Sequence, residues 1–148
     1  MEIIVEIPGK PVPQPRARST RGGRMYTPTK NGIDVYKQAA AMLIAADARR
    51  QGVTMSEVDA FVLDVECVFS RPPSHFKASG DLRETAPRWP FYGVGDWDNL
   101  AKGVQDSIKP LRIIWKDDAQ VVDGRGWKRY AERGEQERTI VRIRRLPP

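Results

Sequence analysis

The sequence has very little of the chemistry that disulfide-bonded, zinc-binding and membrane proteins need. Cys67 is its one cysteine and His75 its one histidine, so neither an internal disulfide nor a zinc site can be formed from it. No apolar run approaches the roughly 20 residues of a membrane helix. The N-terminus, MEIIVEIPGK, has acids where a signal peptide has lysines. We therefore expect a soluble, cytoplasmic protein that binds no membrane.

Several nucleotide-binding and ion-binding motifs are absent as well. The segment GVGDWDN (93–99) has the glycine spacing of neither a phosphate loop nor a dinucleotide-binding loop. DWDNL (96–100) lacks the third oxygen ligand and the glycine of a calcium-binding loop. Ser74 next to His75 leaves a nucleophilic triad possible by residue type, but nothing else in the sequence supports one.

Positive charge is in excess and is unevenly placed. The 148 residues carry a net charge of +6, which suggests a polyanionic partner, although a merely soluble basic protein remains the alternative. Residues 7–33 contain no acid, and a second basic run lies between residues 125 and 145. The cations of the first run that we expect to bind DNA are Lys10, Arg16, Arg18, Arg21 and Arg24, with Lys30 nearby.

Hydrophobic periodicity predicts the order β-α-β-loop-α-β-β. Alternation favours strands, alanine-rich and i, i+3, i+4 patterns favour helices, and proline and glycine mark the loops. We expect one domain over 1–148, an α/β (α+β) fold with a mixed sheet packed by two main helices. The predicted elements are strands 2–7, 60–69, 121–130 and 138–145, the last two as a hairpin, helices 33–50 and 96–108, a basic arm over 8–32, and a Pro/Gly-rich loop over 70–95 that is functional or disordered.

Four aspartates lie around the second predicted helix. Asp96 and Asp98 stand where the loop enters the helix, and Asp117 and Asp118 follow about twenty residues later, beyond the helix and a turn. Metal-dependent nucleases hold Mg²⁺ with several carboxylates, because oxygen ligands suit a hard cation that activates water and shields phosphate charge. The spacing permits such a site.

Ordinary structural roles would explain the same residues. Asp96 could cap the helix and Asp98 could favour its dipole, with Lys102 as an i, i+4 salt-bridge partner. Asp117 and Asp118 could form a solvated turn. Spacing alone therefore leaves both interpretations open.

The motifs as a set resemble those of the RusA family of Holliday-junction resolvases of bacteria and their phages. The combination of DWDNLAK (96–102) with WKDDAQVV (115–122) is far more specific than either half. The segments PGKPVP (8–13), RAR (16–18), YTP (26–28) and RPPSH (71–75) are similar to the phage-borne branch of that family. The resemblance thus touches the beginning, middle and end of the chain.

This resemblance implies a homodimer that makes paired incisions in four-way junctions during DNA recombination and repair. It implies Mg²⁺ as the cofactor, with Mn²⁺ as a substitute. It assigns the metal to Asp96, Asp98 and Asp118, with Asp117 beside them, and the functional lysine to Lys102. It places the protein in a bacterial cell or a phage-infected bacterium. The sequence departs from the family at Gly95, where a known member has arginine, and we expect Arg16 or Arg18 to supply the missing phosphate contact.

Symmetry supports the same expectation. A four-way junction has two related scissile phosphates, and one acidic site cannot reach both, so a two-fold dimer is the economical solution. Lys102, one helical turn from Asp98, would lie close to the scissile phosphate. The alternative is a non-catalytic basic DNA-binding protein, which would bind no Mg²⁺ through these aspartates.

Overall fold

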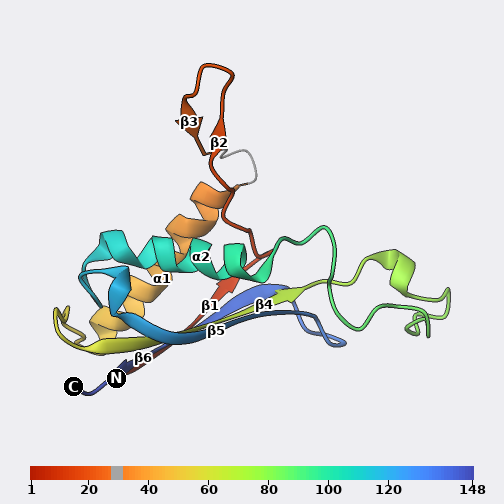
Figure 1. Cartoon of the computed structure of the whole chain (residues 1–148). Helices are drawn as coiled ribbons and strands as arrows, with labels where there is room; N and C mark the ends of the chain where they lie inside the picture. The colour runs from red at the N-terminus through yellow and green to blue at the C-terminus, as the bar shows by residue number, and fades with distance from the viewer. Residues whose placement is uncertain (28–31) are drawn as a thin grey trace.

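A computed structural model describes residues 1–27 and 32–148, so Pro28 and Lys30 of the predicted arm lie outside it. Two helices cover one face of a four-stranded mixed sheet (Figure 1), which confirms the predicted small α+β domain. The helices are α1 (Ile33–Arg50) and α2 (Trp97–Ile108). The sheet strands are β1 (Glu2–Pro8), β4 (Ala60–Phe69), β5 (Val121–Tyr130) and β6 (Arg138–Leu146).

The strand order is β1-β6-β4-β5, so the predicted hairpin of the last two strands is wrong. β6 is antiparallel to β1 and to β4, whereas β5 is parallel to β4. β4 takes the place between β5 and β6 because it is buried on both faces. Phe61 and Val65 pack into the core under the helices, and Val62 and Val68 are buried on the opposite face. Burial on both faces is typical of strands in the interior of a sheet.

Ion pairs lie across the face of the sheet that the helices do not cover. Arg129 on β5 donates to Glu66 on β4 and to Glu135, each over 2.6 Å. Arg142 lies 3.6 Å from Glu66, and Arg144 lies 3.8 Å from Asp64. Several arginines of the second basic run, which the sequence suggests could bind phosphate, therefore pair with carboxylates of the protein itself.

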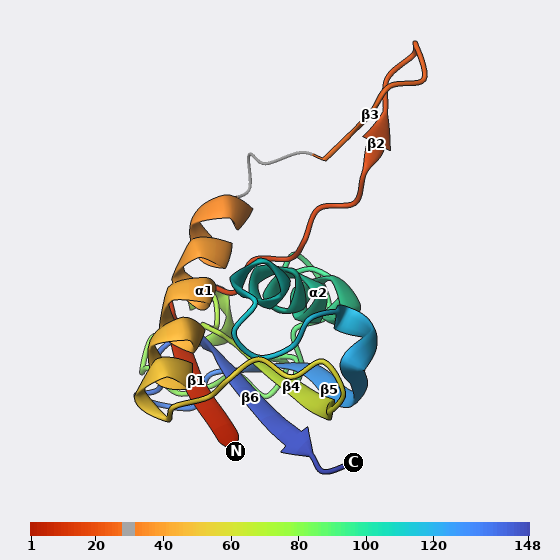
Figure 2. The ribbon, with the colours of Figure 1, turned by 90° about the vertical axis from the view of Figure 1, so that its left-hand side faces the viewer.

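The predicted arm contains a small hairpin that projects away from the domain (Figures 1 and 2). Strands β2 (Arg18–Ser19) and β3 (Met25–Tyr26) pair antiparallel, and Gly23 N donates to Thr20 O over 2.9 Å in the turn. Residues 16–27 are all exposed. Strands of two residues have no alternation to detect, which is why the sequence predicts only a loop there.

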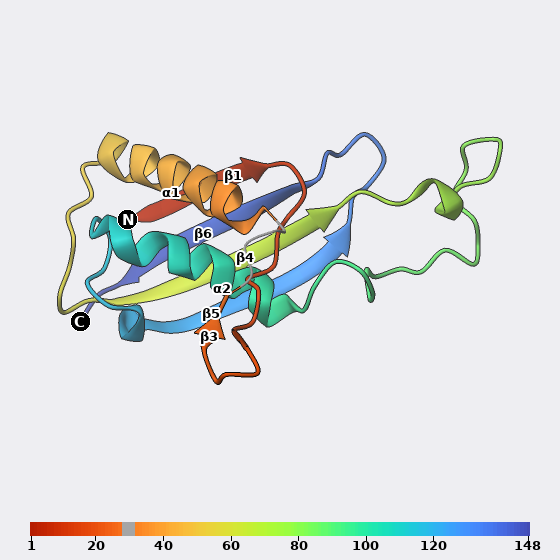
Figure 3. The same cartoon turned by 90° about the horizontal axis from the view of Figure 1, so that it is seen from above.

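The long loop over 70–95 is folded on itself and forms a lobe at one end of the sheet (Figure 3). It contains the short helix η1 (Pro73–His75) and an isolated bridge between Phe76 and Leu82. The amide of Lys77 donates to Asp81 O over 2.8 Å, and the amide of Arg83 donates to His75 O over 2.9 Å. Among the described residues, no helix is long and apolar enough to cross a membrane.

Candidate active site

Asp96 and Asp98 lie at the N-terminal end of α2 and make few contacts that would stabilise the helix. Asp96 is the N-cap by position, yet its side chain accepts no capping hydrogen bond. Its carboxylate is 69% exposed, and among the described residues it forms an ion pair with Arg16 alone. The expected surface pair of Asp98 with Lys102 does not form, because Lys102 donates to Asp106 over 3.1 Å. Both carboxylates are therefore available to a ligand.

Asp117 and Asp118 lie beyond the other end of α2, and their surroundings differ. Asp117 caps the short helix η3 (Asp118–Gln120), and a hydrogen bond from Ala119 N and the Lys109 ammonium lower its pKa. Asp118 Oδ1 accepts the indole N–H of Trp115 over 3.0 Å. Trp115 is fully buried, so it fixes the Asp118 carboxylate and leaves Oδ2 with no hydrogen bond among the described residues.

The fold places these two pairs of aspartates at opposite ends of α2 and β5 (Figure 3). Lys128 near the end of β5 donates to Gly95 O over 2.8 Å, whereas η3 directly precedes the start of β5 at Val121. The 12 residues of α2 between them span about 18 Å. Within residues 1–27 and 32–148 of one protomer, no three acidic, histidine or cysteine side chains are close enough to hold a metal ion.

The base of the arm is fastened to the start of α2. Gln14 N donates to Asn99 O over 2.9 Å. Gly95 has a φ of +93°, and a Cβ there would lie 2.7 Å from Pro13 Cβ. An arginine cannot occupy position 95 without moving the arm. Arg16 Nη2 instead reaches to 3.4 Å from Asp96 Oδ2, so the arm supplies a guanidinium to the same place.

The other predicted DNA-binding residues lie at the start of the arm and on its hairpin. Lys10 is exposed at the start of the arm, and Arg18, Arg21 and Arg24 are exposed on its hairpin. None of these four forms an ion pair with a described residue. The arm therefore presents four cations without an ion pair to a described residue, three of them on its hairpin, as an anion-binding surface requires.

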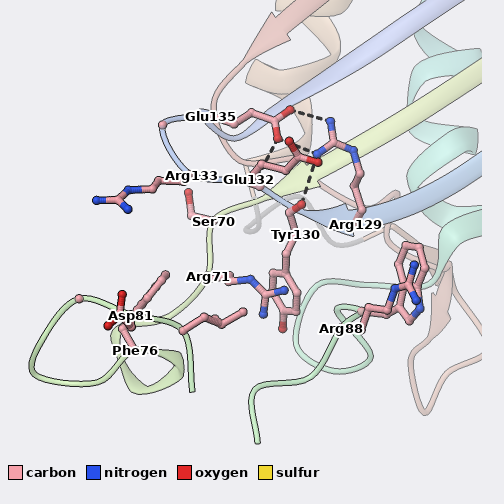
Figure 4. Close-up of a pocket in the computed structure, with 15 residues that line it drawn as sticks. Ser70, Arg71, Phe76, Asp81, Arg88, Arg129, Tyr130, Glu132, Arg133 and Glu135 are labelled. Carbon is pink, nitrogen blue, oxygen red and sulfur yellow. Dashed lines mark hydrogen bonds and ion pairs between the residues drawn. The ribbon is translucent and has the colours of Figure 1, made fainter. Parts of the chain in front are cut away.

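A cavity that the sequence did not predict lies between the long loop and the β5–β6 connection (Figure 4). Its volume is about 720 Å³, and its lining includes Arg71, Phe76, Arg88, Trp89, Tyr130 and Arg133. We call it the Arg71–Tyr130 cavity. The one signal in the sequence is the segment RWPFY (88–92), where large aromatic residues stand in a loop rich in proline and glycine.

Comparison with known proteins identifies a family and a relative. The family model described as Endodeoxyribonuclease RusA matches residues 8–144. A protein of Bacillus subtilis (strain 168), named Uncharacterized protein YqaN, is 33% identical over 141 residues, which cover 93% of this chain and 92% of that protein.

Proposed function

The chain belongs to the RusA endodeoxyribonuclease family, and on this premise we propose that it is a Mg²⁺-dependent endonuclease that resolves Holliday junctions and other branched DNA by paired phosphodiester hydrolysis. The observation that carries the proposal is the freedom of the acidic side chains. Among the described residues, the Asp96 side chain accepts no capping hydrogen bond and Asp98 forms no ion pair along the helix. Asp118 Oδ2 likewise has no hydrogen-bond partner there.

The donor set suits the proposed cofactor. Asp96, Asp98 and Asp118 offer only oxygen atoms, with Asp117 next to the third, and hard divalent cations prefer oxygen ligands. When bound, Mg²⁺ or Mn²⁺ would supply an activated water and shield the charge on the scissile phosphate. Trp115 orients Asp118 through its indole N–H, which holds that carboxylate ready to bind. The 59% exposed side chain of Lys102 can leave Asp106 and offset charge on the phosphate.

One protomer cannot gather these carboxylates, and a two-fold dimer can. A two-fold axis that crosses the α2–β5 edge near its middle exchanges the two ends of α2. Asp118 of one protomer then lies beside Asp96 and Asp98 of its partner, and the second site forms symmetrically. We therefore propose a homodimer in which each metal site is shared between protomers, and in which the two sites serve the two strands to be cut.

The α2–β5 edge has the properties of such an interface. β5 ends the sheet, so its outer backbone groups have no strand partner within the protomer. Trp97 on α2 is 58% exposed and Val122 on β5 is 62% exposed. Both residues line a shallow groove of about 450 Å³ along this edge. An exposed strand edge with apolar side chains next to it favours pairing with a second copy.

Cleavage of labelled four-way junctions and of matched linear duplex, with and without Mg²⁺, tests the proposed function. We expect cuts in paired strands of the junction only, and only with Mg²⁺ or Mn²⁺. Asp118→Asn should abolish cleavage and leave junction binding intact, because asparagine can still accept the Trp115 N–H. The charge-matched control is Asp34→Asn in the first turn of α1. Full cleavage by Asp118→Asn, or junction binding without metal-dependent cleavage by the wild type, would leave the non-catalytic DNA-binding protein as the better description.

A further inference from the structure

The floor of the Arg71–Tyr130 cavity is the Tyr130 ring, with the Arg71 guanidinium packed over it. The Arg71 guanidinium lies 4.4 Å from the centroid of the Tyr130 ring, and His75 meets the same ring edge-on at 5.3 Å. Arg71 Nη1 also donates to Pro87 O over 2.8 Å, so the floor is tied to the far side of the long loop. Three segments far apart in the sequence are thereby fixed around one opening (Figure 4).

The rim carries a second cation–aromatic pair that faces solvent. The Arg88 guanidinium lies 5.3 Å from the Trp89 ring centroid, and Trp89 is 46% exposed. Arg133 stands exposed on the β5–β6 connection and forms no ion pair with any described residue. The exposed indole is apolar surface that a ligand could cover, and the two guanidinium groups beside it could bind an anion.

Of the three acids that line the cavity, Glu135 is paired with an arginine, whereas Asp81 and Glu132 form no ion pair with a described residue. Glu135 accepts from both Nη atoms of Arg129, which holds its pKa at about 2 and keeps it ionised and paired. Asp81 accepts from the Ser79 hydroxyl over 3.2 Å. Four arginines and three acids line the cavity, so its net charge is +1, and the arginines at its rim are Arg88 and Arg133. The chemistry therefore fits a flat π-system that carries an anion.

We propose that the Arg71–Tyr130 cavity binds one unpaired nucleotide of the branched DNA, with its base stacked on Trp89 and its phosphate held by Arg88 or Arg133. This inference rests on the proposed function and adds a site to it. The cavity volume of about 720 Å³ is within the range of sites that enclose small molecules of this kind. Aromatic faces and arginines together are the means by which proteins bind single-stranded nucleic acid without reading its sequence.

The position of the cavity connects it to the acidic site. Asp96 follows Trp89 by seven positions, so their Cα atoms are at most about 25 Å apart. A base within a continuous duplex is stacked on both faces and cannot reach Trp89, whereas a base at a branch point can leave its stack at lower cost. The cavity would thus favour branched over linear DNA and would do so before any bond is cut.

Fluorescence anisotropy with labelled oligothymidylate and with a blunt linear duplex tests the proposal, in buffer without divalent metal. Trp89→Ala should weaken oligothymidylate binding roughly tenfold, because that is the effect of losing one stacking platform. Its affinity for the duplex should stay unchanged, and Trp89→Phe should restore most of the lost binding. Arg88→Ala should also weaken oligothymidylate binding, and Arg49→Ala at the far end of α1 (Figure 3) is its charge-matched control.

Photo-crosslinking of the wild-type chain with an oligonucleotide containing 4-thiothymidine needs no variant, and adducts should map to peptides with Phe76, Trp89 or Tyr130. Equal losses on both DNAs, no loss in Trp89→Ala, or adducts elsewhere would overturn the proposal. A change in the sedimentation of DNA-free Trp89→Ala would also overturn it, in favour of a contact between copies. Junction cleavage by the wild type, measured in parallel, separates the two claims: Trp89-dependent binding without cleavage refutes the nuclease and keeps the nucleotide site.

Discussion

Arg16 Nη2 lies 3.4 Å from Asp96 Oδ2, and 80 positions separate the two residues in the sequence. Both side chains are about 70% exposed, at 72% and 69%, so the pair contributes little to the stability of the fold. A weak, solvated contact of this kind can open without cost when a phosphate or a metal ion approaches. The arm therefore brings a guanidinium to the acidic site without locking it there.

Replacing Arg16 with alanine should weaken junction binding and leave the fold intact. Each phosphate contact that is lost lowers the slope of log K against log salt concentration by about one unit. We expect that change for Arg16→Ala, and a larger one when Arg18 is also replaced, in binding titrations from low to high salt. Arg49→Ala is the control for net charge. An unchanged slope in the double variant would mean that the arm does not contact phosphate.

Gly95 should be far less replaceable than Gly93, although both have positive φ angles, of +93° and +77°. An alanine at either position is strained by about 1–2 kcal/mol because of this backbone conformation. At position 95 the new Cβ would also lie 2.7 Å from Pro13, whereas at position 93 nothing lies within 4 Å. We expect urea unfolding to show the larger loss for Gly95→Ala, together with weaker junction binding. Equal losses would mean that the arm yields freely.

A shared metal site makes a specific prediction for mixed dimers. Asp96→Asn and Asp118→Asn should each be inactive alone. A heterodimer of the two has one site with Asp96 and Asp98 from one protomer and Asp118 from the other, all unaltered. Random mixing after unfolding and refolding should therefore restore about a quarter of the wild-type nicking rate, since half the dimers are mixed and each has one intact site.

The products of the mixture are as informative as its rate. With one working site per dimer, a supercoiled cruciform plasmid should accumulate as nicked circles and not as paired cuts. If each site were built within one protomer, every site in the mixture would carry a substitution and no activity would return. Sedimentation of the wild type at the assay concentration gives the dimer mass independently.

Stability at low pH should depend on Glu135. The Arg129 guanidinium lowers the pKa of Glu135 from 4.5 to about 2. Because the folded pKa is the lower one, the stabilisation is complete above pH 4.5 and is lost as the pH falls toward 2. Glu135→Gln should thus be less stable than the wild type by on the order of 2 kcal/mol at pH 6, with the gap closing near pH 2. Urea unfolding at several pH values, with Glu84→Gln as control, measures this.

The sequence predicted the elements well because each has a strong local pattern. The helix over 33–50 and the strands over 60–69 and 121–130 have the predicted bounds, and the second helix begins one residue late because Asp96 is its N-cap. The pairing of the last two strands could not be read in the same way. Neighbours in sequence often pair in a sheet, and only the burial of β4 on both faces separates them here.

The sequence suggested which residues form the candidate site but not how they are arranged in space. The resemblance to the RusA family assigned Asp96, Asp98 and Asp118, whereas spacing alone left a metal site and ordinary structural roles open and cannot say to which end of α2 the chain returns. If the site is shared by two protomers, it cannot be found within one chain at all. The Arg71–Tyr130 cavity joins residues 59 positions apart, and although Arg71 begins the RPPSH segment, nothing in that segment indicates a cavity.

The place of β6 in the sheet also constrains how the protein is made. Glu2 pairs with Arg144, and β6 is the neighbour of both β1 and β4 although it follows every other strand in the sequence. A ribosome that adds about 5–20 residues per second exposes β1 on the order of ten seconds before its partner exists. During that time the backbone groups of β1 that pair with β6 have no strand partner. The sheet is therefore complete only after residues 138–146 are made, and we expect a nascent chain that stalls before residue 138 to be a substrate for chaperones or proteases.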